Sequence, residues 1–286
     1  RATPPGSLVA ALALGLAPVL GRAGIVRTEV QGDVWRQVAS ELAGRRQQEP
    51  RWRVIDFGPG RDPWSLEVAD AVADTAEVLN SLADCWSVPG APAAKACCSA
   101  PDDSGCFDQG RFTARRCCDP RTSLPRPPLL RFPMDVADPY QHQRLLDHVE
   151  RHGKFDFAIC SFVLQLTSRP QTLLDLLPSI AHAGFVATPS KFRELSFHEA
   201  AASDLYYRGS IAHRWLFSVR AGALQALPKL AFLDADRSFD GFADVSPEVA
   251  ELGVWWERSL PYQALDGDAL GPDVAAVLQR YREAVA

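Results

Sequence analysis

The sequence has no excess of basic residues, which limits the partners that it is expected to bind. Its 30 lysines and arginines are outnumbered by 35 aspartates and glutamates, and the formal net charge is −5. Because nonspecific binding to nucleic acid requires a basic surface that neutralises phosphates, we expect no nucleic-acid partner. The length of 286 residues and a hydrophobic content of 47% predict a globular protein, with one compact domain as its simplest organisation.

The apolar stretch near the start of the chain lacks the length that a membrane span requires. Residues 7–20 are apolar, but they are too few to cross a bilayer comfortably and Pro18 interrupts them. They are either the apolar part of a secretory signal or anchor, since the sequence starts at Arg1 rather than methionine, or a helix packed on the domain. The first interpretation makes this segment a membrane tether.

The full dinucleotide-binding fingerprint G-x-G-x-x-G is absent as well, but a shorter motif stands in its place. Residues 53–60, RVIDFGPG, run from an apolar strand into Asp56, Gly58 and Gly60. Glycine lets the backbone approach a nucleotide-type ligand closely at the carboxyl end of the first strand of an open α/β sheet. The residues after Gly60, RDPW, argue against a nicotinamide-dependent oxidoreductase. The motif therefore predicts an enzyme that uses another nucleotide-type cofactor.

Six of the seven cysteines lie in one segment. They are Cys85, Cys97, Cys98, Cys106, Cys117 and Cys118. An even number suggests three disulfides and hence the lumen of the secretory pathway or secretion, whereas reduced cysteines would indicate the cytoplasm. A metal cluster is the alternative, but the two cysteine doublets do not have the C-x₂₋₄-C spacing of zinc sites and no histidine lies within the segment, so we predict no metal site.

Outside the cysteine-rich segment, strands and helices alternate along the chain. We expect strands near residues 52–57, 129–132, 155–162, 184–188, 230–234 and 253–260. We expect helices near residues 33–45, 142–152, 171–181, 221–226 and 272–285, and either a strand or a helix over residues 68–74. Such alternation implies a largely parallel sheet.

Further polar and aromatic residues follow the predicted strands, where a cofactor would contact them. Asp74 can hold both hydroxyls of a ribose, since a carboxylate accepts two hydrogen bonds at once. Asp135 can accept from an adenine amino group, and Ser161 and Phe162 can line the cofactor. Each also has a simpler explanation: Asp74 as a helix cap, Asp135 as a turn residue and Phe162 as part of the core.

Taken in their order along the chain, these motifs resemble those of the class I S-adenosylmethionine-dependent methyltransferases. The matching segments are VIDFGPG at residues 54–60, MDV at 134–136, FDFAICSFVLQL at 155–166, GFVATPS at 184–190 and HRW at 213–215. The resemblance implies a doubly wound, mostly parallel, seven-stranded Rossmann-like sheet with S-adenosylmethionine over the first strands. The cofactor-binding residues that it implies are Asp56, Gly58, Gly60, Asp74, Asp135, Val136, Ser161 and Phe162.

The resemblance covers about residues 50–80 and 129–235, and it divides the chain. Residues 1–50 form an N-terminal apolar segment with a leading helix, and residues 51–286 form a methyltransferase-like domain. A cysteine-rich insertion at residues 82–128 interrupts this domain. One departure concerns Gln165 and Leu166, which stand where the related branch carries Glu-His.

Methyl transfer to a hydroxyl or an amine requires a base that takes up a proton. The candidates on the loop after the fifth strand are Glu194, His198, Glu199 and His213. We favour His213, because histidine titrates near neutral pH and because the neighbouring Arg214 and Trp215 could orient an anionic or ring-shaped acceptor. The simpler explanation for His213 is an imidazole that is hydrogen-bonded to the backbone.

The sequence thus predicts methyl transfer to a small-molecule, lipid or glycan acceptor. The alternative is a catalytically inactive scaffold that binds a glycan or a protein through the cysteine-rich insertion. The Gln165-Leu166 replacement and the size of the insertion favour this alternative. The retained Asp56, Asp74 and Asp135 disfavour it, because a scaffold has no need of a ribose-binding carboxylate.

Overall fold

The structure is a computed structural model of the whole chain. It describes residues 26–30, 38, 42, 44–45, 47–49, 52–58, 69–75, 129–199, 206–242, 250–265 and 273–285. The cysteine-rich insertion, residues 7–20 and Gly60 lie outside these residues. Cys160 is described: it is a free, buried thiol, and burial raises its pKa above the usual range.

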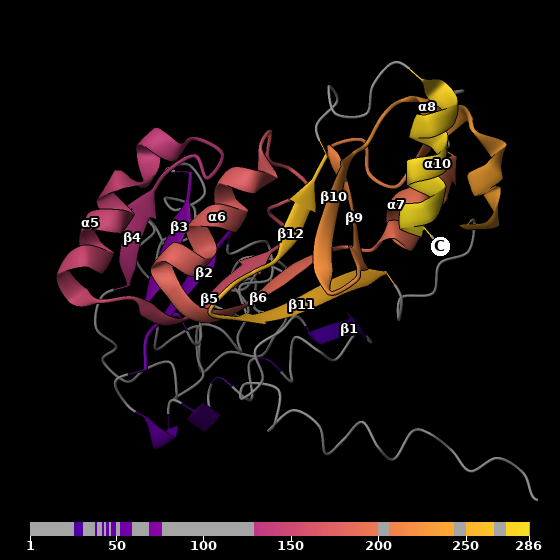
Figure 1. Cartoon of the computed structure of the whole chain (residues 1–286). Helices are drawn as coiled ribbons and strands as arrows, with labels where there is room; N and C mark the ends of the chain where they lie inside the picture. Colours follow the sequence, from indigo (N-terminus) through magenta and orange to yellow (C-terminus); the bar gives the residue numbers. More distant parts are fainter. Residues whose placement is uncertain are drawn as a thin grey trace, which may run out of the picture.

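A seven-stranded sheet forms the centre of the molecule (Figure 1). Its strands are β1 (Val26–Val30), β2 (Val54–Phe57), β3 (Ala71–Asp74), β4 (Leu130–Pro133), β5 (Phe155–Ser161), β6 (Ala181–Pro189) and β11 (Glu251–Glu257). They lie in the order β1-β11-β6-β5-β2-β3-β4. From β4 to β6 all neighbours pair in parallel, whereas β11 is antiparallel to both β6 and β1. The predicted α/β class with a mostly parallel sheet is therefore confirmed.

Both faces of this sheet are covered. On one face, α5 (Gln143–His152) and α6 (Pro170–Ile180) pack over the parallel strands through leucines such as Leu145 and Leu173 (Figure 1). On the other face, Val38 and Leu42 pack against Phe157 and Trp255. Both residues are helical, as predicted for residues 33–45. The strands alternate between the two cores because successive side chains point to opposite faces.

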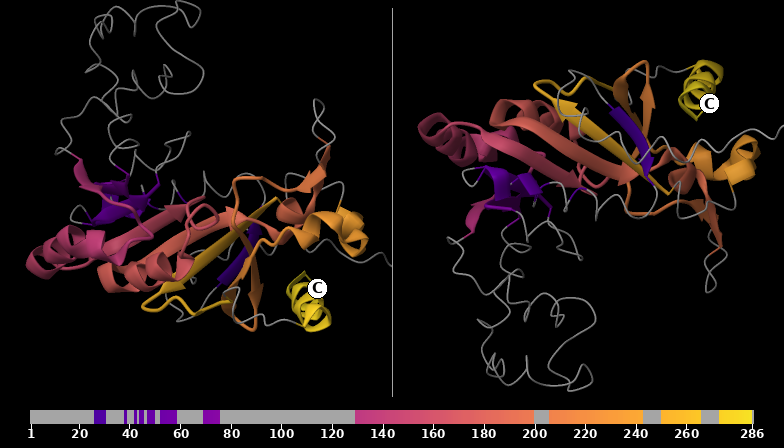
Figure 2. Two further views of the ribbon diagram at one scale, coloured as in Figure 1. Left: turned by 90° about the horizontal axis from the view of Figure 1, so that it is seen from above. Right: turned by 90° about the horizontal axis from the view of Figure 1, so that it is seen from below.

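A smaller layer adjoins the sheet on the face of α6. It holds a three-stranded sheet of β9 (Trp215–Arg220), β10 (Ala223–Pro228) and β12 (Tyr262–Ala264). Around it lie α7 (Lys191–Leu195), α8 (Phe232–Ala235), α10 (Val274–Val285) and the hairpin of β7 (Phe197–Glu199) and β8 (Tyr206–Arg208). The β7–β8 hairpin projects from the side of the molecule opposite α10 (Figure 2). None of the described helices has the length and apolar character needed to cross a bilayer.

Two predicted elements are wrong, and both lie in this smaller layer. Residues 221–226 are not a helix: Ala221 and Gly222 form a turn with positive φ, and β10 follows as the partner of β9. Buried Leu224 and Ala226 alternate with half-exposed residues, which is the period of a strand. Residues 230–234 are not a strand, because α8 begins at Phe232.

A fully buried arginine holds the smaller layer together. Arg208 is 1% exposed, and all five N–H groups of its guanidinium donate hydrogen bonds. One goes to the carboxylate of Asp240 at 2.5 Å. The others go to the backbone carbonyls of Leu195, Leu233, Asp236 and Phe239. The side chain therefore joins the end of α7 to α8 and to the 3₁₀ helix at Arg237–Phe242.

Candidate functional site

The carboxyl ends of β2 and β3 bring three of the predicted cofactor residues together. Asp56 is fully buried on β2 and lies in register with Val72 of β3. Gly58 follows β2, and its N–H donates to the carbonyl oxygen of Ala73 at 3.2 Å. An ideal Cβ on Gly58 would lie 3.8 Å from Oδ2 of Asp74. The three residues therefore lie at the same end of the two neighbouring strands.

The carboxylate of Asp74 is half-buried and has few donors. Among the described residues only Thr75 donates to it, from its backbone N–H to Oδ1 at 2.6 Å. Burial raises the pKa of Asp74, and this effect outweighs the hydrogen bond from Thr75, which lowers it. A ligand with two hydroxyl groups would supply the missing donors, which fits the predicted contact with a ribose.

Gly58 is required by the fold itself. Its φ of +66° is in the left-handed region, and Cγ2 of Val163 lies 2.1 Å from the position of an ideal Cβ. The side chain of Val163 thus occupies the space that glycine leaves open, whereas the sequence motif predicted that a ligand would use it. This contact packs the loop after β5 against the end of β2.

Alanine at position 58 is therefore expected to destabilise the protein. The positive φ and the clash with Val163 together should cost about 2 kcal/mol or more. Urea denaturation followed by far-UV circular dichroism would measure this loss. Gly153→Ala is the matched control, because Gly153 also has a positive φ of +80° but the nearest atom to its ideal Cβ is 3.7 Å away. Equal losses for the two variants would contradict a specific role for the Val163 contact.

The end of β5 has an unusual backbone conformation. Phe162 has a φ of +54°, and its N–H donates to the carbonyl oxygen of Ala187 at 2.9 Å. The side chains of Ser161 and Phe162 are only half-buried, so Phe162 is not simply part of the core. A left-handed non-glycine residue of this kind is uncommon and often occurs at functional sites.

Asp135 and Val136 form a turn after β4. The exposed carboxylate of Asp135 accepts a hydrogen bond from the backbone N–H of Ala137 at 2.9 Å. Val136 is buried, and its carbonyl oxygen accepts from Nε2 of His142 at 3.1 Å. These contacts match the turn explanation for Asp135, and an adenine contact remains a prediction.

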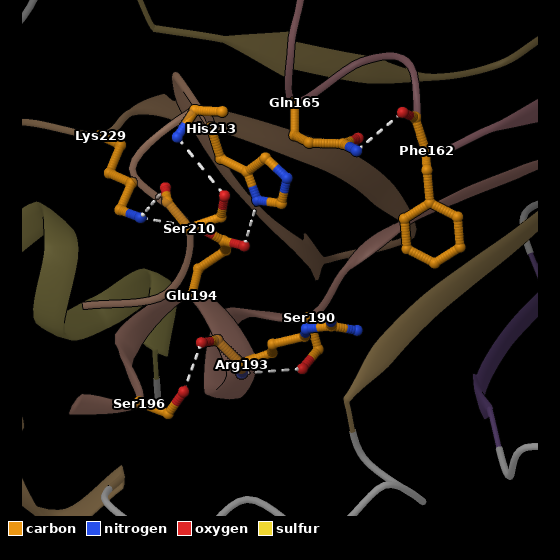
Figure 3. Close-up of polar contacts among 10 residues, drawn as sticks. Phe162, Gln165, Ser190, Arg193, Glu194, Ser196, Ser210, His213 and Lys229 are labelled. Carbon is orange, nitrogen blue, oxygen red and sulfur yellow. Dashed lines mark hydrogen bonds and ion pairs between the residues drawn. The ribbon is translucent and has the colours of Figure 1, made fainter. Parts of the chain in front are cut away.

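A buried carboxylate and a histidine lie close together beyond β6 (Figure 3). Glu194 lies in α7, whose first turn is capped by Ser190, and only 1% of its side chain is exposed. Its Oε1 is 2.6 Å from Nδ1 of His213, and its Oε2 is 2.9 Å from Nζ of Lys229. Two of the four predicted base candidates are therefore in direct contact. The other two, His198 and Glu199, lie on β7, and their side chains are outside the described part of the structure.

The electrostatics of this cluster favour a charged Glu194. Burial raises the pKa of Glu194. The hydrogen bond from His213 and the positive charge of Lys229 together lower it by more, so the net shift is downward. Since a carboxylate only accepts hydrogen bonds, Nδ1 of His213 must be the donor. In a neutral imidazole, Nε2 then carries the lone pair, and no described residue forms a hydrogen bond with it.

Gln165 connects this cluster to the loop after β5 (Figure 3). The backbone carbonyl oxygen of Gln165 accepts a hydrogen bond from the backbone N–H of Arg214 at 2.7 Å. Its side-chain Nε2 donates to the backbone carbonyl oxygen of Phe162 at 2.8 Å. Its Oε1 is buried and receives no hydrogen bond from the described residues. Gln165 therefore holds the segment of His213 beside Phe162, a role that the sequence alone did not suggest.

The expected role of Trp215 in orienting an acceptor is not supported. Trp215 is buried in the core between the layers, and its ring N–H donates to the carbonyl oxygen of Thr167 at 2.9 Å. Arg214 is exposed and remains available to an acceptor. Lys229 was not predicted from the sequence, where its only visible signal is a lysine within the apolar run ALPKLAFL.

No protein-family model matches the chain, and no curated protein matches it. Among solved structures, the chain is similar to the methyltransferase domain of bacterial CtHen1, in its CN and C forms, and to an S-adenosylmethionine-dependent methyltransferase from Mesorhizobium loti.

The sequence identities to these three structures are 12%, 13% and 11%, and the TM-scores are 0.36, 0.34 and 0.30. The matches cover 78%, 79% and 77% of this chain and 98% of each of the other chains. All three are methyltransferases.

Proposed function

We propose that the protein is an S-adenosylmethionine-dependent methyltransferase that acts on a hydroxyl or an amine of a small-molecule, lipid or glycan acceptor. The observation that carries this proposal is the buried pair of Glu194 and His213, which Gln165 ties to Phe162 at the carboxyl end of β5. A base thus lies on the same edge of the parallel sheet as Asp74 and Gly58. Ligands of open α/β sheets bind at this edge.

The residues at this edge fit the proposed cofactor. Asp74 would hold the ribose hydroxyls, and the backbone around Gly58 and Gly60 would lie along the amino-acid part. The adenine would lie near Asp135 and Val136. Asp56, Ser161 and Phe162 would line the rest of the cofactor site. When bound, S-adenosylmethionine supplies an electrophilic methyl group on a sulfonium, and such transfer requires mainly positioning and preorganised electrostatics.

His213 would act as the base toward the acceptor. Glu194 holds the proton on Nδ1, so Nε2 is left to accept the proton that the acceptor hydroxyl or amine loses. Arg214, exposed beside it, would attract an anionic group of the acceptor. A scaffold without catalytic activity gives no reason for a buried charged cluster whose imidazole Nε2 has no hydrogen-bond partner among the described residues, so the binding-module alternative is less favoured.

The cofactor site can be tested by calorimetric titration with S-adenosylhomocysteine. We expect binding by the unchanged protein and about thirtyfold weaker binding by Asp74→Asn, because about 2 kcal/mol of charge-assisted hydrogen bonding is lost. Asp147→Asn, on the surface of α5, is the matched control and should bind normally. Absence of binding by well-folded, unchanged protein would contradict the proposed function.

The titration also has an expected pH dependence. Because burial raises the pKa of Asp74, its carboxylate takes up a proton at a higher pH than an exposed aspartate does. Affinity should therefore begin to fall at a correspondingly higher pH as the solution is acidified. Because the pKa of Asp74 is higher in the folded than in the unfolded state, the free energy of unfolding falls as the pH rises and Asp74 becomes charged. Asp74→Asn should therefore be at least as stable as the unchanged protein at neutral pH.

An oxidising compartment is part of the proposal and depends on the six cysteines of the insertion. Three disulfides among them would place the protein in the secretory pathway or outside the cell. If the cysteines are reduced, a cytoplasmic location follows instead. The apolar residues 7–20 would serve as a tether in the first case.

A further inference from the structure

We propose that Lys229 is a positioning residue for the base, because its ammonium group holds the Glu194 carboxylate against Nδ1 of His213 and balances the carboxylate's charge. The inference rests on the proposed role of His213 as the base. Lys229 follows β10 directly, far along the chain from α7, and neither the motifs nor the resemblance pointed to it.

The ammonium group of Lys229 is enclosed by the cluster. Only 10% of the side chain is exposed, and Nζ donates to Oε2 of Glu194 and to the carbonyl oxygen of Ser210, both at 2.9 Å. The backbone N–H of Lys229 donates to the carbonyl oxygen of Arg214 at 2.8 Å. The N–H of His213 donates to the same Ser210 carbonyl at 3.1 Å. Lys229 and His213 are thus held on opposite sides of one carboxylate.

The backbone around Glu194 leaves little room for another arrangement. Gly209, with a φ of +60°, packs against Glu194 so closely that an ideal Cβ would lie 2.6 Å from Oε2 and 2.7 Å from Cα of Glu194. The carboxylate is therefore confined between Gly209, His213 and Lys229. Each of its oxygens has one charged or ionisable partner, so loss of either partner cannot easily be compensated by water.

Stability alone does not account for a buried lysine at this position. Burial of an ammonium group loses several kcal/mol of hydration free energy, which is about as much as its ion pair gains. Apolar residues of similar volume often stabilise a fold equally well. The ammonium also has three donors and only two acceptors among the described residues. A functional role for the positive charge of Lys229 therefore explains its burial better than stability does.

The charge balance of the cluster shows what that function is. The groups that face His213 are the carboxylate of Glu194, the ammonium of Lys229 behind it and the carbonyl of Ser210. With Lys229 present, the charges of carboxylate and ammonium cancel. Without Lys229, the buried negative charge is unbalanced, and it favours the imidazolium form of His213 over the neutral ring whose Nε2 can accept a proton.

Nitrogen-15 NMR of the histidine rings tests this inference without cofactor or acceptor. We expect the neutral ring of His213 in the unchanged protein to carry its proton on Nδ1, and the doubly protonated ring to persist to a higher pH in Lys229→Met than in the unchanged protein. Lys229→Arg keeps the charge and should behave as the unchanged protein does. The His213→Gln spectrum assigns the signals, and the thermal transition of each variant checks its fold.

Two results would overturn the inference. They are a proton on Nε2 instead of Nδ1 in the neutral ring of the unchanged protein, and a ring that titrates identically in the unchanged protein and in folded Lys229→Met. The first needs no variant, so the test stands even if Lys229→Met does not fold. Failure of the proposed function would appear separately, as absence of S-adenosylhomocysteine binding with the ring state as expected.

Discussion

Replacement of Arg208 with methionine is expected to destabilise the protein by about 4 kcal/mol, since several backbone carbonyl oxygens lose their donor and each unsatisfied buried acceptor costs about 1–3 kcal/mol. Methionine retains most of the volume but none of the five donors. It would leave the carbonyl oxygens of Leu195, Leu233, Asp236 and Phe239 without the guanidinium that they contact. A loss of this size is a large part of the stability of an ordinary domain, which is about 5–15 kcal/mol.

Urea denaturation monitored by tryptophan fluorescence would measure this effect. Arg220→Met is the matched control: Arg220 pairs with Glu283 at 3.0 Å, but its side chain is 55% exposed. Exposed ion pairs contribute about 0–1 kcal/mol, so the control should unfold near the midpoint of the unchanged protein. Similar midpoints for both variants would show that the Arg208 network does not hold the smaller layer together.

Replacement of His213 with asparagine is expected to reduce kcat/KM for methyl transfer by about 10²–10⁴, the range typical of general base catalysis. Asparagine preserves a donor toward Glu194 but cannot accept a proton at neutral pH. Because His213 is assigned to the acceptor and not to the cofactor, the affinity for S-adenosylhomocysteine should change by less than about twofold.

The assay requires an acceptor, which a screen of small molecules, lipids and glycans with radiolabelled cofactor would identify. His182→Asn is a suitable control, because His182 lies on β6 with its side chain exposed. Full activity of His213→Asn would contradict the assignment of the base. Loss of S-adenosylhomocysteine binding by the same variant would instead indicate a role in holding the cofactor.

The central sheet was predictable from sequence because its strands are short apolar runs with clear boundaries. Strand β2 ends where Asp56 and Gly58 predicted, and β5 matches the run FDFAICS. Helices α5 and α6 also begin and end within a residue or two of the expected positions. Each of these elements carries its own periodicity or end signal, so no distant contact was needed to recognise it.

The smaller layer was harder to predict because long-range contacts determine it. The run that includes Leu224 and Ala226 is too short to separate helix from strand, and its pairing with β9 decides the outcome. The contacts within the candidate site also depend on residues that are distant in the sequence. His213 stood out as a motif residue, but Lys229 is 35 residues from Glu194 and 19 from Ser210, so only the fold brings them together.

The pairing of β1 with β11 constrains the order in which the molecule can be completed. Val26 lies opposite Trp255 and Val30 opposite Glu251, so the first and last strands of the sheet meet side by side. During synthesis on the ribosome, β2 to β6 can assemble as soon as they emerge, whereas β1 must wait for nearly the whole chain. Such distant pairing is slow to form. We therefore expect β11 and β1 to join the sheet after β2 to β6 have paired.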